Sequence, residues 1–168
     1  RDLEEDLAAR RGEVAYYGAV LDSVVRANAL LADPRSDPEA LVVSAYRATE
    51  VTYRPPTRST WDEIVSSGDI GLLSRQAVDS GIADYYASDT SLLMFDSLNN
   101  SDYRREVRQI IPLEVQMAIR AGCSDARDAA QQIVGFMEQC VLDVDDAILG
   151  RTANLLRADA DVRAALQY

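Results

Sequence analysis

The sequence contains no histidine and no lysine, so all seventeen of its basic residues are arginine. Histidine is the commonest general base and metal ligand, and lysine supplies the Schiff-base amine and the phosphate-binding ammonium of many sites. Their absence excludes serine–histidine catalysis and the P-loop. Carboxylates, hydroxyls, arginines and two cysteines remain for chemistry. We therefore expect no catalytic residue, no cofactor and no metal, and we identify no small-molecule ligand.

The chain is also poor in positive charge overall, because its net charge is -11 and its sequence pI is about 4.4. Such a surface repels the phosphates of nucleic acids and of anionic lipids, so neither is an expected partner. Its 168 residues, 48% of them hydrophobic, suffice for one domain with a buried core. Without an internal boundary or repeat, the sequence predicts a single helical domain over residues 1–168.

Residues 2–32 carry the clearest helical pattern of the sequence. A stripe of side chains recurs there at alternating spacings of four and three, as along one face of a helix, and all its members are apolar except Arg10 and Asn28. In coiled-coil phasing Asn28 takes an a position, where a buried amide fixes the register of paired helices. The pattern predicts either a seam for self-association or a long amphipathic helix packed in its own bundle, with Asn28 hydrogen-bonded locally. The apolar positions are Leu3, Leu7, Val14, Tyr17, Leu21, Val24 and Leu31.

A capping motif marks the start of a short helix after residue 59. Thr60, Trp61, Asp62 and Glu63 have the spacing of a capping box, in which the threonine and the glutamate satisfy orphan amides of the first turn. Gly68 then fits a left-handed C-cap.

Helical periodicity also dominates the remainder, and no convincing strand pattern is present. The sequence therefore predicts an all-α fold, a helical bundle with a long N-terminal amphipathic helix and about seven to eight helices in total. Val51–Ser59, which contains two prolines, is expected to be an extended connection. Five further helical regions are expected. One helix begins at Asp37, a second region runs from about Ser74 to Leu98, and a third runs from Tyr103 to Ile119 with a kink or new start at Pro112. A fourth runs from Ser124 to Met137, and two short helices follow Asp143.

Cys123 and Cys140 are the only cysteines. A disulfide between them would close a loop of about 17 residues and stabilise the fold by roughly 3 kcal/mol. Two reduced, buried thiols are the alternative, and the spacing does not decide between them. Zinc is not expected, because two cysteines without histidine cannot complete a tetrahedral site.

The carboxylates offer one weak catalytic hypothesis. Asp62 and Glu63 lie beside Trp61, and paired carboxylates beside an aromatic residue are typical of glycoside hydrolases. The denser cluster Asp143, Asp145 and Asp146 lacks the ligand spacing of a calcium loop and is better explained by a helix N-terminus.

One stretch resembles a known group of proteins. Ser59 to Ile70, then Leu72-Leu73 and Ala83-Asp84-Tyr85-Tyr86, is similar to a motif of uncharacterised bacterial single-pass membrane proteins, in which a capped helix leads into Ser-Ser-Gly-Asp-Ile and then a Tyr-Tyr helix. The acidic start Asp2–Leu7 resembles the charged coil that follows their transmembrane helix, although this coil is arginine-rich where theirs is lysine-rich. The surroundings of Cys123 and Cys140 also look like some members.

The resemblance implies topology rather than activity. It places an N-terminal membrane anchor before Arg1, and we expect the chain to be a fragment that lacks it. It also places the domain on the extracytoplasmic side, periplasmic or at the cell surface, where an oxidising setting favours a Cys123–Cys140 disulfide.

The expected function is therefore a non-catalytic, membrane-anchored bacterial domain that acts in protein interaction, assembly or sensing. Its partner would be another protein or a second copy, bound through helices. Two alternatives stay open: a small carboxylate-dependent hydrolase, and a cytosolic adaptor bundle, which predicts free thiols.

Overall fold

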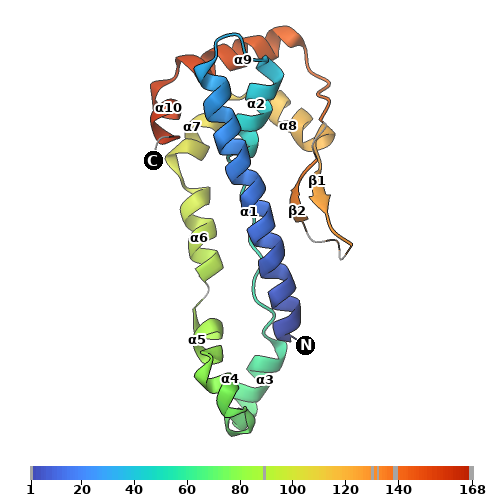
Figure 1. The fold of residues 1–168 in the computed structure, drawn as a ribbon, viewed down its shortest axis with the longest axis vertical. Coiled ribbons are helices and arrows are strands. Elements are labelled where there is room, and N and C mark those ends of the chain that lie inside the picture. Colours follow the sequence, from blue (N-terminus) through green and yellow to red (C-terminus); the bar gives the residue numbers. More distant parts are fainter. Residues whose placement is uncertain (1, 89, 130, 132, 138–139, 167–168) are drawn as a thin grey trace.

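Figure 1 shows a computed structural model that describes residues 2–88, 90–129, 131, 133–137 and 140–166. Most of the described residues are helical, which confirms the predicted all-α architecture and its long first helix. The elements are α1 (Asp2–Ala32), α2 (Pro38–Arg47), α3 (Ser59–Ser67), the 3-10 helix η1 (Asp69–Leu72), α4 (Arg75–Asp79), α5 (Ile82–Ala87), α6 (Thr90–Asn99), α7 (Asp102–Ile110), α8 (Leu113–Gly122), β1 (Asp125–Arg127), β2 (Ile133–Phe136), α9 (Asp146–Ala158) and α10 (Ala160–Ala165).

The molecule is elongated, and α1 runs along most of its length (Figure 1). The C-terminal half of α1 lies among α2, α7, α8, α9 and α10 at one end, which we call the head. Its N-terminus points toward α3, α4 and α5 at the other end, which we call the tip. None of the helices within the described part of the chain is long and apolar enough to cross a membrane.

The hydrophobic core lies in the head, with α2 at its centre. Leu41, Val42 and Ala45 of this helix are completely buried between α1 and α9. The helix begins as predicted, because the Asp37 carboxylate accepts the N–H of Ala40 at 3.0 Å and proline occupies the first helical position. Its partners in the core include Ala27, Val107, Ile111, Val115, Ile119, Leu149, Ala153, Leu156 and Val162.

The predicted capping box of α3 is wrong. Thr60 lies inside the first turn, and neither Thr60 nor Glu63 provides the predicted cap. Instead the Asp2 carboxylate of α1 accepts the backbone N–H of Thr60 at 2.7 Å. An ionised carboxylate is a stronger acceptor than a hydroxyl, and the tertiary fold brings it to the helix end. The other end agrees with the prediction, because Gly68 has a left-handed φ of 79°.

The helix predicted from Ser124 to Met137 is also wrong, and an antiparallel hairpin of β1 and β2 replaces it. The Cα atoms of Cys123 and Cys140 are 4.8 Å apart. A continuous helix over the residues between them would separate its ends by about 20 Å, at 1.5 Å per residue. Only a chain that turns back allows the two cysteines to meet, so the predicted absence of strands fails here.

The segment from Ser74 to Leu98 is helical as predicted but interrupted. α4 ends before Gly81, whose φ of 79° is incompatible with a continuous helix, and a second break at Ser88 separates α5 from α6. Pro112 starts α8 afresh after α7, as predicted. The connection over residues 51–58 is extended, also as predicted.

Candidate functional site

Cys123 and Cys140 form a disulfide, so the alternative of two reduced thiols is wrong. The bond ties the end of α8 to the segment that follows the hairpin.

The carboxylates beside Trp61 do not form an enclosed pair. Asp62 and Glu63 are both exposed, and Asp62 pairs with Arg58 at 3.3 Å. The Trp61 ring stacks on Tyr86 instead, with ring centres 5.1 Å apart, and so helps to hold the tip together. Asp145 caps α9 through the N–H of Ala147, as expected for a helix start. The described residues hold no group of three or more potential metal ligands.

The predicted stripe of α1 is divided between the core and solvent. Leu31 is buried, and Tyr17 and Val24 are half-buried against the domain. The rest of the stripe is exposed, and so is Asn28 at its C-terminal end. Together with Val25, these exposed residues form what we call the α1 stripe: Leu3, Leu7, Val14, Leu21 and Val25, each between 49% and 75% exposed.

The members of the α1 stripe lie on one side of the helix, separated by four or seven residues. At 100° per residue its five members fall within an arc of about 40°. The Arg10 guanidinium on α1 donates to the Ser91 hydroxyl of α6, and Figure 1 shows α6 alongside α1. α6 adds further exposed apolar side chains on its own surface: Leu92, Leu93, Met94 and Leu98.

A second feature is a hollow of about 420 Å³ between α2, α7, α8 and the hairpin, which we call the arginine hollow. Five arginines line it against two carboxylates, although the chain as a whole is strongly acidic. The charged lining residues are Arg47, Arg104, Arg108, Arg120 and Arg127, with Glu50 and Asp125.

Arg108 is held firmly in the wall of the arginine hollow. Its Nη2 pairs with Glu50 at 2.8 Å and its Nε donates to the Thr49 hydroxyl at 2.6 Å. Its guanidinium carbon also lies 3.6 Å from the centre of the Tyr46 ring, a close cation–π contact. The carbonyl of Thr49 accepts Arg104. α2 ends at this point, and the partial negative charge of a helix C-terminus favours nearby cations.

The other arginines have fewer protein partners. Arg120 donates through Nε to the Tyr46 hydroxyl at 2.7 Å, a bond that raises the pKa of Arg120. Burial lowers the pKa of Arg104, and the like charges of Arg108 and Arg120 lower it further. Arg47 stacks over Phe136, and its buried Nη2 makes no hydrogen bond with the described residues. The hollow thus contains cations that repel one another.

The arginine hollow was not predicted from the sequence. Arg104 and Arg108 are four residues apart on a helix, a spacing that places both on one face and gives a local signal. Arg47, Arg120 and Arg127 come from α2, α8 and β1, and only the tertiary fold brings these elements together.

No protein family matches this chain, and no curated protein or solved structure is significantly similar to it. Functional conclusions therefore depend on the geometry of the molecule itself.

Proposed function

We propose that this chain is the non-catalytic, extracytoplasmic part of a membrane-anchored bacterial protein, and that it acts in assembly by pairing with a second copy through α1. The observation that carries the proposal is the α1 stripe. Five apolar side chains in one line along a 31-residue helix are exposed to water. Exposed apolar side chains gathered on one side of a helix are a feature of interaction sites.

A second copy is the occupant that fits the stripe best. Leu7, Val14, Leu21 and Asn28 are spaced by seven residues, as are the a positions of a two-stranded coiled coil. The d positions Tyr17, Val24 and Leu31 pack against the domain, so the proposed seam uses the a positions and the residues beside them. Leu3 and Val25 widen this seam at its two ends. In a parallel pair each residue meets its own copy, so the two Asn28 amides would hydrogen-bond to each other and set the register.

The proposed anchor favours the parallel arrangement. The resemblance to single-pass membrane proteins places that anchor on the N-terminal side of α1, so both copies would emerge from the membrane in the same direction. The disulfide of the head supports the extracytoplasmic location, because such bonds persist in oxidising compartments.

Sedimentation equilibrium over a concentration series tests the pairing. We expect the chain to dimerise, and we expect the double variant Val14→Glu/Leu21→Glu to be a monomer because four carboxylates would meet in the seam. Leu155→Glu, at an equally exposed leucine of α9, is the control and should dimerise like the parent. A parent chain that stays monomeric up to about 1 mM would contradict the proposal.

Cysteine cross-linking tests the orientation. Leu21→Cys introduces one reactive thiol, because Cys123 and Cys140 are already bonded. In a parallel pair the two new thiols lie opposite each other, so mild oxidation should give a covalent dimer. Leu155→Cys should remain a monomer, and equal cross-linking of both variants would indicate random collision rather than the proposed pairing.

A further inference from the structure

We propose that Arg104, Arg108 and Arg120 form a binding site for a small oxyanion with at least two negative charges. This inference is independent of the pairing through α1, because it concerns the head and not the α1 stripe. It assigns a ligand to a domain whose sequence indicates none.

The arginine hollow carries a surplus of positive charge. Glu50 neutralises Arg108 directly, at 2.8 Å, and Asp125 is the only other carboxylate in the lining. Among the described residues, neither Arg104 nor Arg120 forms an ion pair with a carboxylate, although Glu50 attracts both from a greater distance. Each makes one side-chain hydrogen bond, to an uncharged oxygen. Each guanidinium carries five N–H donors, so most of their donors remain available to a ligand.

The same three arginines also line a neighbouring hollow of about 470 Å³. Every residue in the wall of this second hollow is an arginine or a side-chain amide. Two of its arginines pair with carboxylates outside the wall, Arg105 with Asp102 and Arg108 with Glu50, whereas Arg104 and Arg120 form no such pair among the described residues. Arg104, Arg108 and Arg120 thus stand between two hollows and present charge to both. The remaining wall residues are Asn99, Asn100, Arg105 and Gln116.

Two of the three guanidinium groups are held in place by the protein before a ligand binds. Arg108 is fixed by Glu50, Thr49 and the face of Tyr46, and Arg120 is fixed at one nitrogen by the Tyr46 hydroxyl. Anchored guanidinium groups lose less conformational entropy when a ligand binds. Their planar forks match the oxygens of carboxylate and phosphate groups, which they bind through paired hydrogen bonds.

These features define the ligand by its chemistry. A singly charged anion would leave part of the surplus charge unpaired, whereas two acidic groups, or one doubly ionised phosphate, would match Arg104 and Arg120. An anion would also relieve the repulsion that Arg104 experiences from Arg108 and Arg120. The arginine hollow and its neighbour are each large enough for a compact polycarboxylate or phosphate compound.

Isothermal titration calorimetry at constant ionic strength tests the site with citrate, succinate, inorganic phosphate and acetate. We expect saturable binding of at least one multiply charged anion, with a Kd below about 1 mM, and no saturation with acetate. Comparison of phosphate with the two polycarboxylates distinguishes the two sources of oxyanion. Arg104→Gln and Arg120→Gln should each weaken binding by about tenfold or more.

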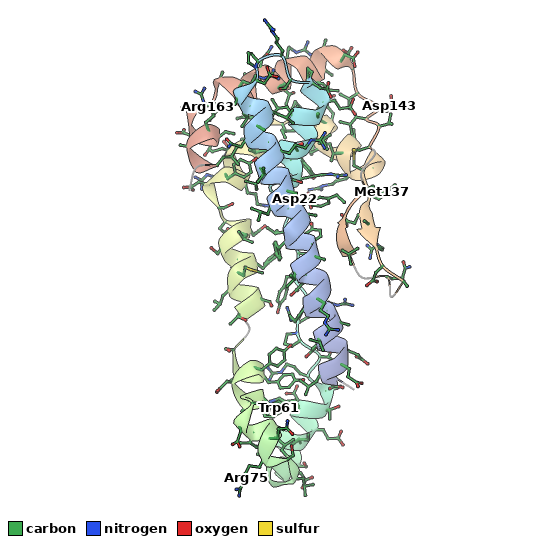
Figure 2. All side chains as sticks on the ribbon, in the orientation of Figure 1. Asp22, Trp61, Arg75, Met137, Asp143 and Arg163 are labelled. Atoms are coloured by element: carbon green, nitrogen blue, oxygen red, sulfur yellow. A yellow bond between two sulfur atoms is a disulfide. The ribbon has the colours of Figure 1, made fainter. Side chains whose placement is uncertain are left out.

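Arg75→Gln is the matched control, because it removes the same charge at the opposite end of the molecule, where Figure 2 labels this residue. It should bind like the parent. Arg104→Gln should also keep its thermal stability in the absence of ligand, because the loss of one hydrogen bond is offset by relief of like-charge repulsion. If Arg104→Gln unfolds, the exposed Arg120→Gln decides the question.

The proposal is overturned if none of the multiply charged anions saturates the protein below about 10 mM. It is also overturned if Arg75→Gln weakens binding as much as the two variants in the head, because the anion would then respond only to overall charge.

Discussion

The carboxylate of Asp2 accepts the backbone N–H of Thr60 at 2.7 Å, so the beginning of α1 caps the beginning of α3. The Ser59 hydroxyl donates to the same oxygen at 3.1 Å. Both bonds favour the ionised carboxylate, and the Thr60 amide is the main cause that lowers the pKa of Asp2. One of the attachments of the tip to α1 thus favours a charged group; Asp6 supplies another, by accepting the Thr57 amide at 2.7 Å and the Tyr85 hydroxyl at 3.2 Å.

Acid should release this attachment before it unfolds the head. The folded state lowers the pKa of Asp2 below its unfolded value of about 3.9, so the stabilisation is complete above that value and is lost as the pH falls through the folded pKa. Trp61 is the only tryptophan and stacks on Tyr86 at the tip. Its fluorescence emission should shift to the red below about pH 4, while the far-UV circular dichroism of the helices persists.

Asp2→Asn should remove much of this acid-dependent step and loosen the tip already at neutral pH. Asp69→Asn, which alters an exposed carboxylate at the same end, should leave the emission profile of Trp61 unchanged. Identical acid titrations of Asp2→Asn and the parent would show that the Thr60 cap does not control the tip.

Local signals in the sequence were sufficient for the helices and insufficient for tertiary caps. The start of α2 at Asp37 and Pro38 and the C-cap of α3 at Gly68 both depend on immediate neighbours in the chain. The structure agrees with both predictions. The cap of α3 comes from Asp2, far away in the chain, so Thr60 with Glu63 gave a misleading local signal. The length of α1 was predictable because helical spacing continues from Leu3 to Leu31 despite the polar Arg10 and Asn28. The face that it buries was not predictable, because its two faces differ little in hydrophobicity.

The hairpin of β1 and β2 could not be predicted from local signals either. Ile133, Phe136 and Met137 have spacings that suit a helix, and a short two-stranded sheet has too few residues to produce a clear alternating pattern. The long-range bond between Cys123 and Cys140 selects the hairpin. The arginine hollow was unpredictable for the same reason, since its members come from four elements.

Removal of the disulfide should destabilise the head. The bond closes a loop of 17 residues, so the double variant Cys123→Ser/Cys140→Ser should lose about 3 kcal/mol of unfolding free energy. Urea denaturation followed by far-UV circular dichroism measures the loss, and intact mass before and after reduction verifies the bond in the parent. An unchanged urea midpoint after reduction would contradict this expectation.

Two glycine substitutions should have opposite effects on stability. Gly68→Ala places a side chain at a φ of 79° and should cost about 1 kcal/mol, seen as an earlier thermal transition in Trp61 fluorescence. Gly150→Ala lies inside α9, where an added Cβ meets nothing within 4 Å, and should gain about 0.5–1 kcal/mol. Destabilisation by both alanines would show that the conformation at Gly68 is not the cause.

Two substitutions of Tyr46 should separate the contribution of its hydroxyl to the stability of the fold from the contribution of its aromatic ring. Its ring is buried beneath Arg108, and its hydroxyl accepts Arg120 at 2.7 Å. Tyr46→Phe keeps the ring and removes only the acceptor, so it should cost about 0.5–1.5 kcal/mol in urea denaturation. Tyr46→Leu also removes the aromatic face beneath a partly buried cation and should cost at least about 1 kcal/mol more. Equal losses in the two variants would mean that the cation–π contact of Arg108 adds nothing to the stability of the fold.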